Sequence, residues 1–444
     1  MKKLFILFFT TILVQTCTYA NNLEYINISF WQKFNDNILV DNLIKVYENN
    51  NDLKAAVLKT NEANRIVKMS FANELPHIGF EGYVGRIFKS SDEVFGNITI
   101  PNYAETHYYL PLSMNYEVDI WGKNHLITKS KKKQFEIVKQ DERCAYIYIT
   151  SAFAVDYFNL IRCDKLIDYQ KQLITLQEQI INYYKIRYEY GTATLSEIDE
   201  AEKNLTYMKE DLHKLLEKQD MLKNQISTLL GDRAFKDISR THYEDLNFSF
   251  TTPDSIDFNM LDKRPDRIKS ELDLEKIGID IKVAKRDLLP KFIITGNLGF
   301  NMYNLHSSHK FLADLGIVPM WDLFMGERKL QMLKLKKDQF EIATQKYEKT
   351  ILTAIQETND ALYAMKTAEN IKTITDDRLN TDVKELGYMK IKEDSGTADN
   401  LDLILQEEKL LISKKQAVSS KINKIISAIN LYQALGGVDF TNNL

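Results

Sequence analysis

The chain has 444 residues, enough for two or three domains or for one long duplicated unit. It holds 58 Lys and Arg against 62 Asp and Glu, a net charge of −4, and this balance argues against a polyanion-binding protein, so no nucleic acid partner is expected. Hydrophobic residues make up 44%, with only 7 Pro and 16 Gly. This composition excludes disordered, collagenous and disulfide-scaffold chains and predicts long regular elements.

Residues 1–20 have the features of a secretory signal peptide. A charged start precedes an apolar run of about 14 residues, which is too short to cross a bilayer as a helix. Residues 18–20 supply the small side chains that signal peptidase reads, so the mature chain is expected to begin at Asn21. Cys17 leaves lipid attachment as an alternative, although residues 14–16 form a poor lipobox.

The rest of the chain offers no stretch of about 18 uninterrupted apolar residues, so the exported protein is expected in the periplasm, in the medium, or in a membrane as a β-barrel. Cys144 and Cys163 lie on one predicted helix about 28 Å apart, which excludes a disulfide between them. His306 and His309 are predicted to lie in a polar loop without a metal. No nucleophile, paired-carboxylate or metal-ligand pattern supports an enzyme, so no catalytic residue, metal or cofactor is expected.

The same order of landmarks occurs twice along the chain. One helix is predicted from Asn51, its expected N-cap, to Pro76, and another from Pro265 to Pro290. Each closing proline ends its helix because proline cannot continue the hydrogen-bond ladder. After each proline the apolar pattern changes to period two, which predicts strands.

Each strand block leads into a long helix and a return helix. Helix formers dominate both long segments without a proline, which predicts two helices of roughly 65 residues, each about 100 Å long. Each long helix then meets a Gly-Thr-Ala tripeptide, at residues 191–193 and 396–398. The strands are expected at 77–118 and 291–320, the long helices at 123–188 and 328–391, and the return helices at 195–230 and 399–435. The first repeat would then span residues 21–231, the linker 232–257 and the second repeat 258–444.

The first long helix carries two neighbouring apolar seams. One is heptad-spaced, and the other follows it one residue later. A helix with two seams packs against neighbours on both sides, which favours a closed tube of helices; the alternative is an ordinary broad core stripe. The seams are Leu166, Tyr169, Leu173, Leu176, Ile180 and Tyr183, and Ile167, Ile174, Ile181 and Tyr188.

The duplicated chain resembles the TolC-type outer-membrane efflux channels, particularly their multidrug branch. The resemblance covers nearly all of the mature chain and rests on several motifs that occur in the family's order. These are Phe30–Asp36, Tyr116–Gly122, Arg264-Pro265-Asp266, the two Gly-Thr-Ala turns and the ending Leu431–Gly437.

The resemblance implies a fold that is mainly α with a small β part. Three chains would form a homotrimer whose shared 12-stranded β-barrel crosses the outer membrane and continues as a periplasmic α-helical tunnel. The channel would passively conduct substrates from an inner-membrane pump, with a periplasmic adaptor and outer-membrane lipid as further partners. Two alternatives stay open: a type I protein secretion channel, and an exported coiled-coil stalk or adhesin, which leaves the strand blocks unexplained.

The resemblance also suggests site residues at the periplasmic tip. Both turns, with Gly191 and Thr192 in one and Gly396 and Thr397 in the other, would lie there because a long helix reverses at a left-handed residue. The entrance would be lined by Asp402 and Glu197, with Asp399 one turn earlier. Alternatively, Glu197 and Asp402 are only favourable acids in the first helical turns.

Two residues depart from the TolC pattern at this tip. Ala398 stands where an Arg helps to lock the closed state, and Glu393 stands where a Tyr is expected, although Tyr188 keeps that place in the first copy. The closed-state lock must then use other contacts. Near the first strand-to-helix corner, Lys129 and Lys131–Lys133 are expected either to form a solvated helix face or to contact anionic headgroups of the inner leaflet.

Overall fold

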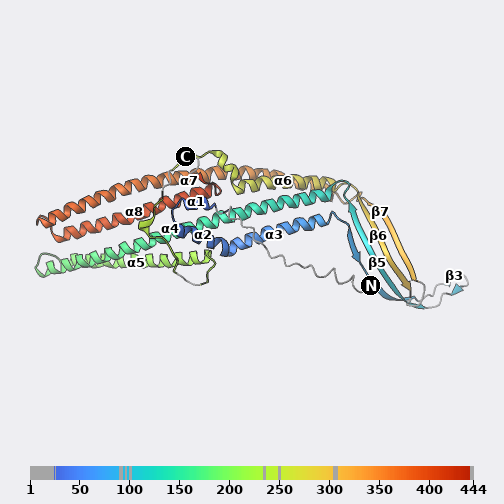
Figure 1. The fold of residues 1–444 in the computed structure, drawn as a ribbon, viewed down its shortest axis with the longest axis horizontal. Coiled ribbons are helices and arrows are strands. Elements are labelled where there is room, and N and C mark those ends of the chain that lie inside the picture. Colours follow the sequence, from blue (N-terminus) through green and yellow to red (C-terminus); the bar gives the residue numbers. More distant parts are fainter. Residues whose placement is uncertain are drawn as a thin grey trace. The chain divides into compact units, whose positions relative to one another are not determined.

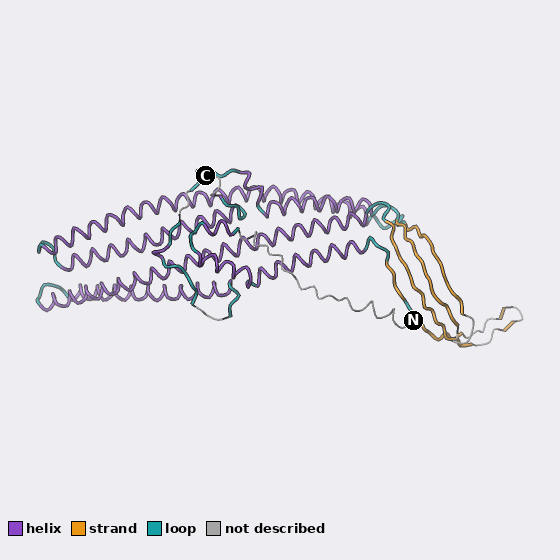
Figure 2. Tube along the Cα trace, in the orientation of Figure 1, coloured by secondary structure: helices purple, strands orange, loops and turns teal. Residues whose placement is uncertain are grey.

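The computed structural model describes residues 25, 27–89, 94–95, 98–99, 103–233, 237–248, 252–303 and 309–440. The predicted signal peptide, Cys17 and His306 lie outside the described residues. The chain is mainly helical with a small antiparallel sheet, as Figures 1 and 2 show. It divides into two compact units that each draw on both repeats: a helical unit of Met1–Ala56, Glu142–Pro265 and Thr353–Leu444, and a sheet unit of Val57–Asp141 and Asp266–Leu352.

The sheet unit contains an antiparallel sheet in the order β1-β5-β6-β7. β2 also pairs with β5, beyond the end of β1, so β1 and β2 act as one interrupted strand along the same neighbour. β3 and β4 form a separate two-stranded hairpin. The strands are β1 His77–Phe80, β2 Tyr83–Lys89, β3 Val94–Phe95, β4 Ile98–Thr99, β5 Tyr103–Val118, β6 Lys291–Tyr303 and β7 His309–Met320. His309 thus begins a strand, and the prediction of a loop at this residue is wrong.

The two faces of the sheet differ in polarity because side chains alternate along each strand. One face carries Ser113, Asn297 and Asp314 in register, and Asn297 donates a hydrogen bond to Asp314 at 3.1 Å. The other face carries Leu112 and Leu298 as register partners, and both are about half exposed. The period-two sequence pattern therefore produces one polar face and one exposed apolar face.

Four helix segments of the sheet unit follow the lateral order of the strands. These are parts of α3 (Asn51–Ala72), α4 (Lys123–Glu189), α6 (Pro265–Arg286) and α7 (Arg328–Asp394). Ser70 and Thr128 share a buried hydrogen bond of 3.1 Å between α3 and α4, and Ser130 of α4 donates to Asp280 of α6 at 2.6 Å. Lys336 of α7 lies 3.9 Å from the same Asp280.

Helix α3 begins at Asn51, and Asn50 is its N-cap. The Asn50 side chain accepts hydrogen bonds from the backbone N–H groups of Asp52 at 2.9 Å and Leu53 at 3.0 Å. The expectation of Asn51 as the cap is therefore wrong by one residue, because both asparagines have the chemistry of a cap and only the backbone path selects one.

In the helical unit, α4 lies between the two return helices, α5 (Leu195–Leu229) and α8 (Asn400–Ala434). On one side, Gln177 of α4 donates to the Ala201 carbonyl of α5 at 2.8 Å. On the other side, Ile180 and Ile181 share an apolar cluster with Leu401 and Ile404 of α8. This supports the prediction that α4 packs on both sides.

Helix α7 contacts α8 through its buried face in the helical unit. Thr375 shares a 2.7 Å hydrogen bond with Ser420, and Lys424 donates to Glu369 at 2.6 Å. The contacts therefore place the helices in the order α5-α4-α8-α7, with α5 and α7 at the two edges.

Each return helix is followed by a glycine that lies against the backbone of another segment of the helical unit. Gly231, at φ +71°, follows α5, and a Cβ there would lie 2.6 Å from the Asn49 carbonyl oxygen. Gly436, at φ +69°, follows α8, and a Cβ would lie 2.9 Å from the Cα of Arg264. Only glycine fits such a backbone contact in this conformation.

The N-terminal helices α1 (Ile28–Gln32) and α2 (Asn37–Asn49) cover the middle of α4 in the helical unit. The Phe30 ring stacks on Tyr432 at 4.0 Å between centroids. Asp36 caps α2 by accepting from Leu39 N–H at 3.0 Å, and it also accepts the Tyr157 hydroxyl proton at 2.8 Å. The Thr241 hydroxyl of the linker donates at 2.8 Å to Oδ1 of Asp36, the oxygen that also accepts from Leu39 N–H, so one buried carboxylate joins α2, α4 and the linker.

Candidate functional site

Both long helices end in the same left-handed turn. Gly191 has φ +71° after α4 and Gly396 has φ +72° after α7, and no heavy atom lies within 4 Å of a Cβ built at either. Glycine is therefore favoured by the backbone conformation and not by lack of space. The next residues close the helix ends, since Thr192 N–H donates to the Arg187 carbonyl at 2.8 Å and Thr397 N–H to the Lys392 carbonyl at 2.9 Å.

The acidic residues after these turns form capping boxes. Thr194 caps α5, and the Glu197 carboxylate accepts from Thr194 N–H at 2.7 Å. Asp399 caps α8 by accepting from Asp402 N–H at 2.9 Å, while Asp402 accepts from Asp399 N–H at 3.4 Å. Each acid therefore has a structural role at a helix N-terminus.

One hydrogen bond links the two repeats at the tip. The Tyr183 hydroxyl of α4 donates to the Asp399 carboxylate of α8 at 2.9 Å. The pKa of Asp399 is lowered, first by the Asp402 backbone hydrogen bond and then by Tyr183. Arg187 lies one turn after Tyr183, with its guanidinium 5.8 Å from the ring centroid.

Arg187 also acts on both acidic turns. Its positive charge lowers the pKa of Asp399 and of Glu197, although the Thr194 backbone hydrogen bond is the larger cause at Glu197. The tip thus brings together Tyr183, Arg187 and Asp399, with Asp402 in the same capping box.

Sequence reasoning predicted the acids and missed the tyrosine and arginine that face them. Tyr183 was assigned only to a packing seam, and Tyr188, the position expected from the family pattern, is exposed. The available signal was the spacing of Tyr183 and Arg187, which lie two turns and one turn before Gly191 on one helix face.

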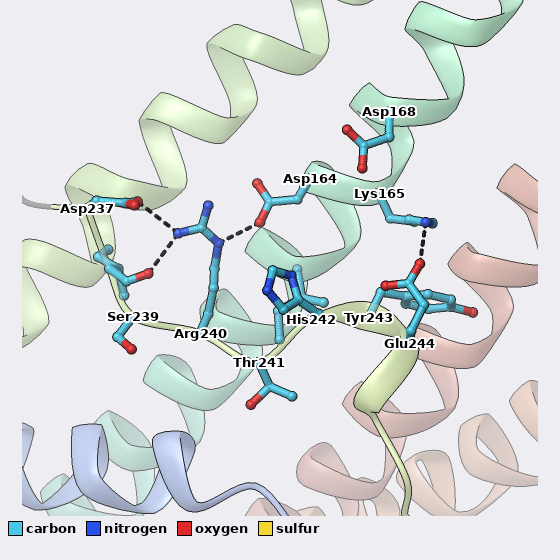
Figure 3. Close-up of a pocket in the computed structure, with 12 residues that line it drawn as sticks. Asp164, Lys165, Asp168, Asp237, Ser239, Arg240, Thr241, His242, Tyr243 and Glu244 are labelled. Carbon is cyan, nitrogen blue, oxygen red and sulfur yellow. Dashed lines mark hydrogen bonds and ion pairs between the residues drawn. The ribbon is translucent and has the colours of Figure 1, made fainter.

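A second polar site lies between the linker and α4 (Figure 3). It is a pocket of about 290 Å³ whose charged groups are largely paired with one another. Arg240 donates to Asp164 at 2.5 Å and to Asp237 at 3.0 Å, and Lys165 donates to Glu244. The hydrogen bond to Lys165 lowers the pKa of Glu244. These pairs fasten the linker to α4, so the pocket has a structural role.

Among the described residues, no group of three or more His, Cys, Asp and Glu side chains could hold a metal ion. Helix α4 is the one described helix that is long and apolar enough to cross a membrane by length and composition. Its most apolar window has a mean hydropathy of 1.3 and is 61% buried, which is also usual for a core helix, so this is weak support for a membrane span.

The chain is similar in sequence to a known protein family and to several of its members. The family model for outer membrane efflux proteins matches residues 43–232 and 259–437. The chain is 24% identical over 423 residues to the toluene efflux pump outer membrane protein TtgC of Pseudomonas putida, covering 92% of this chain and 84% of that protein. It is 21% identical to the cation efflux system protein CusC of Escherichia coli, covering 93% and 90%.

Solved structures agree with the family match. The Campylobacter jejuni CmeC outer membrane channel superposes with a TM-score of 0.82 at 21% identity, covering 94% of this chain and 90% of that one. The outer membrane protein VceC of Vibrio cholerae gives 0.79 at 19% identity, covering 92% and 98%. The predicted family and fold class are thereby confirmed, and the chain belongs to the outer membrane efflux protein family, whose members are channel proteins.

Proposed function

We propose that three copies of this chain assemble into one outer-membrane exit duct, which passively conducts substrates handed over by an inner-membrane pump and a periplasmic adaptor. The edges of the sheet, which are unpaired within the described part of the chain, are the main observation that supports this proposal. The sheet offers four strand positions with an exposed apolar face, and within the described residues nothing pairs with its outer edges at β1/β2 and β7. Four strands cannot close a barrel, and lipid does not tolerate open edges, so further copies must supply the missing strands.

The helices support the same assembly. α5 and α7 are the edges of the helical unit, and α7 exposes a stripe of large apolar side chains on the face opposite α8. The stripe includes Leu352, Tyr363, Ile374 and Tyr388, which are 64–68% exposed. A neighbouring copy that covers this stripe would complete a tube of helices.

The relatives favour an efflux duct over the alternatives. Their names refer to toluene in one case and to cations in another, on one shared architecture. The duct therefore serves a pump that selects the cargo, and the chain itself performs no catalysis. Neither a type I secretion channel nor a coiled-coil stalk is favoured by these relatives.

Planar bilayer recording tests the duct. The purified protein should migrate as a trimer and give discrete conductance steps after reconstitution. A monodisperse soluble monomer without channel activity would overturn the proposal.

The tip residues are proposed to form the periplasmic entrance. In a trimer, Asp402 and Asp399 would be repeated three times around a narrow opening, which would attract cations. The Tyr183–Asp399 hydrogen bond is proposed to hold the two helix pairs together in the closed state. It would replace the closed-state lock of the TolC pattern, which Ala398 and Glu393 cannot form. Its geometry supports this, because it joins the long helix of one repeat to the return helix of the other.

Single substitutions separate the two parts of this entrance. Tyr183→Phe removes the hydroxyl and should raise the open probability. Tyr190→Phe is the matched control, because the Tyr190 side chain has no hydrogen-bond partner among the described residues and is 80% exposed. Asp402→Asn keeps a capping acceptor but removes the charge, so blockade by a periplasmic trivalent cation should weaken. Equal blockade in parent and variant would remove Asp402 from the entrance, and equal open probability in both Tyr variants would remove Tyr183 from the closed-state contact.

A further inference from the structure

Four helix segments of the sheet unit carry an unusual excess of positive charge. They are the ends next to the strand–helix corners, and the strand register places all four corners at one end of the sheet. Residues 65–75, 121–133, 276–291 and 321–337 together hold 17 Lys and Arg against 5 Asp and Glu, although the whole chain holds 58 against 62. We call these the corner segments.

Each of the five acids of the corner segments has a polar partner within the sheet unit. Asp287 accepts from Lys123, and Asp322 lies 3.0 Å from Lys329. Asp280 accepts from Ser130 at 2.6 Å and lies 3.7 Å from Lys276. The other two acids are engaged with His125 and Gln331. The acids therefore leave the remaining lysines without neutralising charge.

Most of the remaining basic residues are exposed. They include two on α4 and two on α7 that lie about 9–14 Å from the helix starts at 1.5 Å per residue. Within the described part of the chain, none of them has an ion pair or a hydrogen bond through its side chain. The exposed lysines are Lys68, Lys129, Lys132, Lys282, Lys285, Lys334 and Lys337, and Arg65 and Arg328 are exposed as well.

Tryptophans mark the corners beside these lysines. Trp121 is 40% exposed and donates its indole N–H to the Pro290 carbonyl at 2.7 Å. Trp321 is 61% exposed and donates to the Leu288 carbonyl at 3.2 Å. Both rings are thus fixed at the corner end of the sheet, and exposed Trp at such a position is typical of a membrane–water interface.

We propose that the exposed lysines of the corner segments form a basic belt that binds anionic phospholipid headgroups of the leaflet facing the periplasm. This inference rests on the outer-membrane placement of the sheet. Lysine stems of the first helical turns can extend toward the corners, so their ammonium groups reach phosphates just below the Trp rings. A second copy of the chain carries the same positive excess, so charge repulsion disfavours burying the belt between copies. Lipid phosphates carry the opposite charge and are therefore the proposed ligands of the belt.

Tryptophan fluorescence in vesicles tests the belt. The chain has 3 Trp, and Trp31 is fully buried, so quenching by brominated lipids reports on Trp121 and Trp321. The reconstituted protein is compared in phosphatidylcholine vesicles that contain equal fractions of brominated phosphatidylglycerol or brominated phosphatidylcholine. The belt predicts a roughly five-fold higher apparent affinity for the anionic lipid at low ionic strength, which falls in high salt.

Two variants with the same loss of charge complete the experiment. K129Q/K132Q/K334Q/K337Q should abolish the lipid preference, whereas K171Q/K384Q/K390Q/K409Q, four exposed lysines of the helical unit, should retain it. Loss in both variants, or retention in both, would overturn the belt, as would a parent protein without preference. Failure of brominated phosphatidylcholine to quench either corner Trp would instead contradict the membrane placement itself.

Discussion

Helices α4 and α7 have the same length, 67 residues, and the same place in the two repeats, yet α4 is buried on two faces and α7 on one. Residues of the two helices correspond at an offset of 205, the spacing of Gly191 and Gly396. On the first face, Phe153 and its counterpart Thr358 are both buried, at 0% and 3% exposure. On the opposite face, Phe158 is 1% exposed and its counterpart Tyr363 is 66% exposed.

The difference comes from what precedes each repeat. The ring of Phe34, which follows α1, lies 5.6 Å from the Phe158 ring, so the N-terminal segment covers the second face of α4. In the second repeat only the short 3-10 helix Phe258–Lys263 precedes α6, and no described segment of the chain covers Tyr363 in the same way. The two duplicated helices thus differ in burial because only the first repeat has an N-terminal segment that covers the second face of its long helix. The exposed face of α7 is then available for contact with another copy.

The largest expected effect is on the covered face. Phe158→Ala should lower the free energy of unfolding by roughly 3–5 kcal/mol, because it leaves a cavity under Phe34. Tyr363→Ala, its counterpart, should cost less than about 1 kcal/mol in the isolated chain. Denaturant unfolding of the monomeric chain in detergent, followed by circular dichroism, measures both. Similar losses would contradict the assignment of a single-faced α7.

A charge on the open face should act on assembly instead of folding. Ile374→Asp puts a carboxylate into the exposed stripe of α7, where a neighbouring copy would have to bury it at a cost of about 3 kcal/mol. The variant should keep its helicity but elute as a monomer on size exclusion with light scattering. Asn380→Asp adds the same charge at an exposed polar position of α7 and should stay trimeric. A trimeric Ile374→Asp variant would exclude this stripe from the interface.

The two helices should also differ in pH dependence. Burial raises the pKa of Asp156 on α4 to about 6 from an ordinary 3.8, whereas its counterpart on α7 is Ala361. The folded state binds this proton more tightly than the unfolded state, so stability falls as pH rises from about 4 to about 6 and stays lower above that window. Asp156→Asn should therefore stabilise the protein by on the order of 2 kcal/mol at pH 7.5 and by little at pH 4.

Thermal unfolding at both pH values measures this effect. Ala361→Ser, a neutral change at the matched position of α7, provides the control and should show no such pH dependence. A stabilisation of Asp156→Asn that persists unchanged at pH 4 would show that packing and not charge is responsible.

The duplicated landmarks were sufficient to predict the fold class, because Pro76 and Pro290 end helices by local chemistry and the period-two pattern after them is local as well. The contacts that build the site were not predictable, because they join distant residues. The Tyr183–Asp399 hydrogen bond spans 216 positions, and the bonds of Asp36 to Tyr157 and Thr241 span 121 and 205. Sequence pattern names residue types suited to such contacts, but only the packing of helices selects their partners.

The smallest expected effect concerns the ends of the two long helices, where the comparison predicts equality. Gly191 and Gly396 have nearly the same φ, and neither has a heavy atom near a built Cβ, so Val at either position meets conformational strain without a steric clash. Each substitution should cost roughly 1–2 kcal/mol locally, because a β-branched residue disfavours the left-handed region. The overall melting temperature should hardly change, whereas hydrogen exchange of the amides that close these turns, such as those of Thr192 and Thr397, should accelerate to a similar degree in the two variants. If the turns also engage a periplasmic adaptor, both variants should lower efflux in cells while the trimer persists. Faster exchange at one turn only would mean that the other can adopt a different helix ending, and the two tips would then not be equivalent.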